Sequence, residues 1–249
     1  MKGKGIFFPF KRAGICQQRP SIDPKKERHM KVLIFNGSPR SNGNTSALLQ
    51  EVMRGATDVG AQVDQIIAYQ ANIRYCTGCL KCNLVRHCVL RDDEWPELSQ
   101  KIIESDALIF GSPVYFHHLS APLKKILDRF RSFMEVRITE SGLQHTPWHQ
   151  WRKHFVLILC LGSPAPDDAQ PIIDLFQFMI EVLGEQNRLT VVVGTRLAVI
   201  NQVRMTEGQL QELYTKLKLP LEFVAEDYRK NQELLAQCYQ LGKNLAKWS

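Results

Sequence analysis

Three features are missing from this 249-residue sequence, and each absence narrows the class of protein. It has no run of about 18 consecutive apolar residues, so we expect no membrane-spanning helix. The apolar part of its opening stretch, Gly5 to Phe10, is too short for a secretory signal peptide, which favours a cytoplasmic protein. The seven cysteines cannot all pair, and an odd count in a cytoplasmic chain argues against a disulfide framework.

Positive charge is confined almost entirely to the start of the chain. Residues 1–29 carry eight basic and two acidic side chains, which accounts for +6 of the net charge of +7. Nucleic-acid binding predicts basic residues spread over a folded face together with stacking aromatics, so we expect no nucleic-acid partner. We expect residues 1–30 to form a basic arm, and residues 31–249 to form one domain with a cysteine-rich insertion at 75–91.

From residue 31 onward, short apolar runs alternate with amphipathic stretches. The runs that suit buried strands are 32–35, 61–68, 107–110, 155–161 and 189–193. Helices are expected at 46–60, 93–104, 120–134, 168–183, 206–218 and 222–247, and a long loop at 137–153. The alternation predicts a flavodoxin-like doubly wound α/β fold, whose five-stranded parallel sheet has the order 2-1-3-4-5. In that fold the ligand crevice lies at the carboxyl ends of strands one and three.

A polar loop, GSPRSNGNTS at 37–46, joins the first strand to the first helix. It matches neither the Walker A pattern nor the Rossmann pattern G-x-G-x-x-G. The first N–H groups of a helix lack partners within the helix and carry partial positive charge, which suits an anion. We therefore predict a cofactor phosphate site whose side chains are Ser38, Arg40, Asn44, Thr45 and Ser46. The alternative is an ordinary helix start capped by Asn44 or Thr45.

A second loop, GSPVYF at 111–116, follows the fully apolar third strand. A flavin ring needs a flat apolar wall and backbone groups for its pyrimidine edge, and both are offered by Pro113, Val114, Tyr115 and Phe116. The alternative is that these aromatic rings pack inward. Gly-Ser-Pro occurs again after the fourth strand, and we add Gly162 to the predicted cofactor contacts. His117 and His118 flank this site, but we assign no side chain as a catalytic acid or base.

Four cysteines fall within thirteen positions, namely Cys76, Cys79, Cys82 and Cys88. Three thiolates at two-residue gaps can surround one face of a [4Fe–4S] cluster, and a fourth nearby completes the ligand set. Structural zinc more often uses two separated cysteine pairs, but zinc or a redox dithiol formed by Cys79 and Cys82 stays an alternative. The scattered Cys16, Cys160 and Cys238 are interpreted as ordinary thiols.

The combination of GSPRSNGNT and GSPVYF resembles the flavodoxin-like NAD(P)H-dependent FMN reductases, and the cysteine run between them resembles the iron-sulfur flavoprotein branch. The resemblance spans roughly residues 31–247. It implies that both loops contact FMN and that the four cysteines ligate a [4Fe–4S] cluster near the flavin. It also implies a homodimer or homotetramer.

Together these features predict an FMN-dependent oxidoreductase in which a [4Fe–4S] cluster exchanges electrons with the flavin. The expected electron donor is NAD(P)H or ferredoxin. One alternative is an NAD(P)H-dependent FMN or quinone reductase whose cysteines are structural. Another is a non-catalytic flavin-binding electron carrier.

Overall fold

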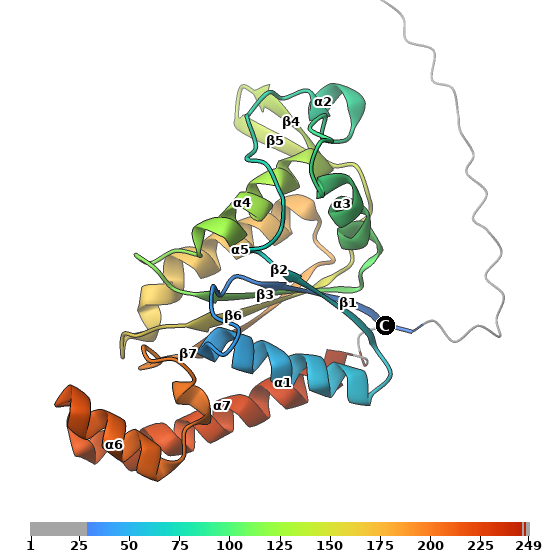
Figure 1. The fold of residues 1–249 in the computed structure, drawn as a ribbon. Helices are drawn as coiled ribbons and strands as arrows, with labels where there is room; N and C mark the ends of the chain where they lie inside the picture. The colour runs from blue at the N-terminus through green and yellow to red at the C-terminus, as the bar shows by residue number, and fades with distance from the viewer. Residues whose placement is uncertain (1–28, 246, 248–249) are drawn as a thin grey trace, which may run out of the picture.

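The computed structural model describes residues 29–245 and residue 247 (Figure 1). The predictions for the basic arm and for Cys16 therefore lie outside the described residues, apart from the last two positions of the arm. Met30, the residue before the first strand, is buried and packs against the domain core.

The centre of the molecule is a parallel sheet with the order β2-β1-β3-β6-β7. All four strand pairings are parallel, which confirms the predicted fold class and strand order. The strands are β1 (Lys31–Asn36), β2 (Gln62–Ile67), β3 (Ala107–Pro113), β6 (His154–Cys160) and β7 (Arg188–Gly194). Every residue of β6 is buried, as expected for a central strand of a sheet that is covered on both faces.

Helices cover the two faces of the sheet (Figure 1). One face packs against α3 (Trp95–Glu104), α4 (Ala121–Arg129) and α5 (Gln170–Leu183), and the other against α1 (Asn44–Asp58) and α7 (Val224–Leu245). Alternate strand residues face opposite sides, so Phe35 and Phe110 stack at 4.7 Å toward α4, whereas Ile34 and Ile109 face α1. The core therefore has two layers, one on each side of the sheet.

The last long helix lies directly against the first, as expected for a helix that covers the sheet. Two glycines permit the close approach: a Cβ at Gly55 would lie 2.1 Å from the Tyr239 carbonyl oxygen, and one at Gly242 would lie 2.1 Å from that of Val52. The remaining helical elements are α2 (Cys82–Val85), α6 (Glu207–Leu217), η1 (Phe130–Phe133), η2 (Pro166–Ala169), η3 (Gln202–Arg204) and η4 (Leu221–Phe223). Within the described residues, no helix is long and apolar enough to cross a membrane.

The sequence prediction was wrong for the segment between α4 and β6. The predicted helix at 120–134 corresponds to α4 followed directly by η1, whereas the expected loop at 137–153 contains an antiparallel hairpin that begins at Met134. Its strands are β4 (Met134–Thr139) and β5 (Gly142–Pro147). The apolar side chains of Ile138 and Leu143 are largely exposed, so the hairpin lacks the apolar–polar alternation of a half-buried strand pair.

Candidate functional site

The predicted cofactor loops meet at one edge of the sheet, which we call the carboxyl edge and define as residues 37–46, 111–118 and 162. The Gly37 N–H donates to the Gly111 carbonyl oxygen at 2.7 Å, which joins the loop after β1 to the end of β3. A Cβ at Gly37 would lie 2.9 Å from the Ser120 Oγ atom, so only glycine allows this contact without rearrangement. The Val114 N–H donates to the Cys160 carbonyl oxygen at 2.9 Å, which places Gly162 at the same edge.

Helix α1 begins without a side-chain cap. Its N-cap is Gly43, so the alternative in which Asn44 or Thr45 caps the helix is wrong. The first-turn N–H groups have no acceptor within the helix, and the macrodipole adds partial positive charge there. The exposed Arg40 side chain stands in the same loop. This end of the helix therefore has the donors and the charge that suit a phosphate.

The buried hydroxyl groups of this loop hold the loop itself together. Ser46 Oγ donates to the Arg40 carbonyl oxygen at 2.7 Å and accepts from Asn36 Nδ2 at 3.0 Å. Ser38 Oγ donates to the same carbonyl oxygen at 3.1 Å. Thr45 is buried and its hydroxyl contacts the Cys160 thiol, whose pKa burial raises to about 12. The structure brings these predicted residues together, and their role as cofactor contacts stays a prediction.

Asn44 connects the loop to a segment that sequence reasoning missed. Its Nδ2 donates to the carbonyl oxygens of Leu197 and Val199 at 3.0 and 2.8 Å. Its Oδ1 accepts from the Val203 N–H at 3.0 Å. The side chain is buried, so Asn44 positions the loop after β7 beside the phosphate loop. The sequence carried no signal for this, because the partners lie more than 150 residues away.

The loop after β3 forms a two-residue hairpin turn that carries exposed aromatic side chains. Tyr115 and His118 exchange two backbone hydrogen bonds of 2.9 and 3.0 Å, and Phe116 and His117 between them have φ of +49° and +59°. Such a turn favours Asn and Gly, so a Phe-His pair there is strained. Phe116 is fully exposed and Tyr115 half-exposed, so the alternative that these rings pack inward is wrong.

Two further contacts complete this edge. His117 Nδ1 lies 3.2 Å from the Asp168 carbonyl oxygen, which ties the aromatic turn to the segment after β6. Tyr69, directly after β2, is half-exposed, and its pKa is raised by partial burial and by the nearby Tyr115. Sequence reasoning missed Tyr69, although its place at the end of a predicted strand was a usable signal.

The second predicted site is the cysteine segment, which we define as residues 74–90. All four predicted ligands, Cys76, Cys79, Cys82 and Cys88, line one cavity of about 30 Å³. Gly78 and Leu80, between the first three cysteines, have φ of +65° and +58° and so turn the chain tightly. The four thiols are free, and within the described residues no group of three or more His, Cys, Asp or Glu is close enough to hold a metal ion.

The chemistry of the residues around this cavity fits an iron-sulfur cluster. Thiolates are the ligands such clusters use, and four cysteine side chains line the cavity. A hydrogen bond from the Lys81 N–H lowers the pKa of the exposed Cys79 thiol. Burial raises the pKa of Cys82, against the opposing effect of Arg131, whose Nη1 lies 3.6 Å from the Cys82 Sγ. The cavity therefore combines the required sulfur atoms with a compensating positive charge.

The two sites lie at opposite ends of α4 (Figure 1). The aromatic turn leads into the helix through Ser120, and the cysteine segment contacts Arg131 just beyond its other end. Eleven residues of helical rise correspond to about 16 Å. The described part of one chain therefore does not place the cysteines beside the predicted flavin site.

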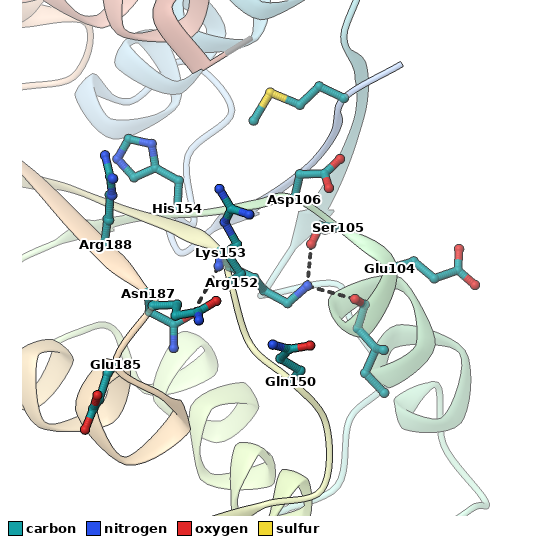
Figure 2. Close-up of a pocket in the computed structure, with 13 residues that line it drawn as sticks. Glu104, Ser105, Asp106, Gln150, Arg152, Lys153, His154, Glu185, Asn187 and Arg188 are labelled. Atoms are coloured by element: carbon teal, nitrogen blue, oxygen red, sulfur yellow. Dashed lines mark hydrogen bonds between the residues drawn. The ribbon is translucent and has the colours of Figure 1, made fainter. Parts of the chain in front are cut away.

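A cavity of about 940 Å³ lies at the amino ends of the strands, away from both sites. Figure 2 shows the Lys153 side chain directed at main-chain oxygens: its Nζ donates to the carbonyl oxygens of Ile103 and Ser105. The Asp106 carboxylate accepts from the Lys31 N–H at 2.8 Å. These contacts connect α3, β1 and the residue before β6, so they stabilise the fold.

The fold and the paired loops at its carboxyl edge define a flavodoxin-like α/β protein. Residues 30–184 match the family described as NADPH-dependent FMN reductase, and the chain belongs to that family. The family supports FMN as the cofactor.

Three known proteins illustrate the similarity. An iron-sulfur flavoprotein of Archaeoglobus fulgidus is 39% identical over 100 residues, which is 40% of this chain and 45% of that protein. An iron-sulfur flavoprotein of Methanocaldococcus jannaschii is 38% identical over 102 residues, which is 41% of this chain and 52% of that protein. The chain thus spans about half the length of these relatives. The solved NAD(P)H:quinone oxidoreductase of Methanothermobacter marburgensis shares the fold, with a TM-score of 0.59, 16% identity and coverage of 88% of this chain and 100% of that one.

Proposed function

We propose that the protein is an FMN-dependent oxidoreductase whose four clustered cysteines hold a [4Fe–4S] cluster that exchanges electrons with the flavin. The observation that carries the proposal is at the carboxyl edge. There, an uncapped helix start and a strained turn with exposed aromatic rings stand at the ends of adjacent strands. Membership in the FMN reductase family points to the same cofactor.

We assign different parts of FMN to different residues of the carboxyl edge. The first-turn N–H groups of α1 and the Arg40 guanidinium would bind the phosphate. The side chains of Tyr115 and Phe116 and the backbone of Pro113 and Val114 form the wall for the ring. Gly162 stands at the same edge, where a Cβ would lie 3.3 Å from the Ala198 Cβ, and we keep it among the proposed cofactor contacts. When bound, the flavin would supply the electron-transfer chemistry, and the chain would orient it.

The cysteine segment supplies the second part of the proposal. The sulfur atoms of Cys76, Cys79, Cys82 and Cys88 would hold the cluster, and the names of the iron-sulfur flavoprotein relatives support this assignment. The surface of the segment is basic: Lys81 and Arg86 are exposed, and no acidic residue occurs between 74 and 90. This charge suits an acidic electron carrier such as ferredoxin, and family membership suits NAD(P)H as the donor.

A second candidate is an NAD(P)H-dependent FMN or quinone reductase without a cluster. One observation favours it: although the four cysteines line one cavity, no three of them in the described residues are grouped closely enough to hold a metal ion. The third candidate, a non-catalytic flavin-binding carrier, differs from both in having no turnover with any donor and acceptor pair.

We further propose that the protein is cytoplasmic and forms a homodimer or homotetramer. The six described cysteines are free thiols, which suits a reducing compartment. The exposed apolar side chains of Phe116, Ile138 and Leu143 suit burial against a second copy. Size-exclusion chromatography with light scattering tests the assembly, and a monomer at micromolar concentration would contradict it.

Anaerobic purification followed by absorption spectroscopy and analysis of iron and sulfide separates the candidates. The proposal expects flavin bands over a broad iron-sulfur absorption, with about four iron atoms per chain. Flavin bands without iron, together with bleaching by NADPH at a catalytic rate, would support the second candidate. Flavin that no reductant turns over would support the third.

A further inference from the structure

Both ends of the cysteine segment are fixed by a single side chain from α4. The Arg129 Nη1 donates to the Arg74 carbonyl oxygen at 2.9 Å, and its Nη2 donates to the Leu90 carbonyl oxygen at 3.0 Å. These two residues bracket the four cysteines. One guanidinium group therefore closes the base of the segment.

This closure is rigid because Arg129 is itself anchored. Its Nη1 lies 2.6 Å from the Asp93 Oδ2, and neither side chain of this ion pair is exposed. The same carboxylate oxygen accepts from the Arg74 N–H at 2.8 Å. The Trp95 ring lies 5.0 Å from the guanidinium. Removal of one partner would leave a buried charge without compensation.

A second arginine, two residues later, contacts the segment at its centre. The Arg131 Nη1 lies 3.6 Å from the Cys82 Sγ and 2.9 Å from the Met134 carbonyl oxygen, to which it donates. Its Nη2 donates to the Asn83 Oδ1 at 2.8 Å. Asn83 is in turn held by β4, because its Nδ2 donates to the Val136 carbonyl oxygen at 2.9 Å. The guanidinium is thus fixed from three sides beside a sulfur atom.

We propose that Arg131 is a positioning residue for the centre held by the cysteines: it fixes Cys82 in place and keeps a positive charge beside its sulfur. The inference rests on the proposed function, in which these cysteines hold a cluster. Groups that hydrogen-bond to the ligands of a metal site typically contribute 10- to 100-fold to metal affinity. Net charge and hydrogen bonds at the sulfur atoms also set the reduction potential of a cluster.

The test compares three variants of the full chain, purified and reconstituted without air. In Arg131→Met the charge and the hydrogen bonds are lost, and in Arg131→Lys the charge is kept. Arg137→Met is the matched control, because Arg137 lies on the neighbouring hairpin, is exposed and pairs with Glu135. The release of iron to a chelator and the midpoint potential of the cluster are measured. Thermal unfolding and FMN affinity report whether the fold is intact.

We expect iron release to be about 10-fold faster in Arg131→Met than in the unaltered chain. We also expect its midpoint potential to be more negative, because the lost positive charge stabilised the reduced centre. Arg131→Lys should keep most of the potential, and Arg137→Met should change neither quantity. Should Arg131→Met fail to fold, Asn83→Ala removes the amide that orients the guanidinium and should also accelerate iron release. Iron release and potential equal to those of the unaltered chain would overturn the inference.

A separate arm distinguishes failure of this inference from failure of the proposed function. If the unaltered chain takes up no iron, the cluster proposal fails, and the same variants are titrated with Co²⁺ while the thiolate-to-metal absorption is followed. About 10-fold weaker Co²⁺ binding by Arg131→Met would support the positioning role at a cluster-free site. Equal Co²⁺ binding, or none by either chain, would overturn it.

Discussion

The carboxyl edge of the sheet and the cysteine segment differ in how their geometry is set. At the carboxyl edge the Ser38 and Ser46 hydroxyl groups are buried and both donate to the Arg40 carbonyl oxygen, so the shape of the loop after β1 is fixed by its own residues. The cysteine segment is mostly exposed, and its position is fixed by Arg129 and Arg131 from another element. The phosphate loop is thus preorganised by hydrogen bonds among its own residues, and the cysteine segment is held by residues of α4 and η1.

This difference has a consequence for ligand binding. A preorganised loop loses little conformational entropy when a ligand binds. A metal centre in an exposed segment contributes its binding free energy to the folding of that segment, because the site is incomplete without the metal. We therefore expect the phosphate loop to keep its shape without FMN, and the cysteine segment to become more ordered when its centre is loaded.

The largest effect on stability is expected when Arg129, which holds both ends of the cysteine segment, is replaced. Arg129→Met leaves Asp93 buried without its partner, and breaking a buried ion pair lowers the free energy of unfolding by about 3–5 kcal/mol. Urea denaturation measures the change. Arg229→Met, which removes an exposed pair with Glu233, is the control and should have no measurable effect. A loss no larger than that of the control would show that Arg129 does not stabilise the fold.

A smaller effect is expected from the network behind the phosphate loop. Asn44→Ala leaves the buried N–H of Val203 and two carbonyl oxygens without their partner, so we expect a loss of about 1–3 kcal/mol of unfolding free energy. FMN binding should weaken as well, because α1 and the loop after β7 lose their connection. Asn42→Ala, at an exposed position of the same loop, is the control. Unchanged stability in Asn44→Ala would mean that its contacts with the loop after β7 do not stabilise the fold.

The aromatic turn should show opposite effects on stability and binding. Phe116→Gly relieves a positive φ in a fully exposed residue, so we expect unfolding to require about 1 kcal/mol more. The same change removes part of the proposed flavin wall and should weaken FMN binding. Calorimetry of the cofactor-free chain and FMN titration measure the two effects. Tighter FMN binding by the variant would contradict the placement of the ring.

The smallest effect is a pH dependence that belongs to neither site. Burial lowers the pKa of His154 below its ordinary value of 6.5, with a further contribution from Arg188. Between the lowered pKa of the folded state and the ordinary pKa of the unfolded state, the unfolded chain binds more protons than the folded chain. Stability therefore falls as pH drops below about 6.5. We expect His154→Gln to flatten this part of the curve of melting temperature against pH. An equally steep curve in the variant would assign the dependence to other groups.

Most of the fold could be predicted from the sequence because the relevant patterns are local. Each central strand is a short apolar run, and both cofactor loops directly follow such runs, so the rule for doubly wound sheets was enough to bring them together. The cysteine spacing was also a local signal: the four cysteines line one cavity, and their role as ligands stays a prediction.

The parts that could not be predicted depend on partners far away in the chain. Asn44 appeared to be a phosphate donor or a cap, but its side chain bonds to residues beyond 196 that no local pattern connects to it. The role of Arg129 had no local signal, because its partners precede it by 36 to 55 residues. The β4–β5 hairpin was missed because its apolar side chains stay exposed and show no period.

Titration of the cofactor-free protein with FMN, followed by flavin fluorescence, tests whether the carboxyl edge binds the flavin. We expect the flavin fluorescence to be quenched until about one FMN is bound per chain, because one helix start and one aromatic turn form one site. We also expect weaker binding by Arg40→Ala, in which the guanidinium beside the phosphate is lost. Unchanged fluorescence in the presence of excess protein, with no rise in melting temperature on addition of FMN, would contradict the account.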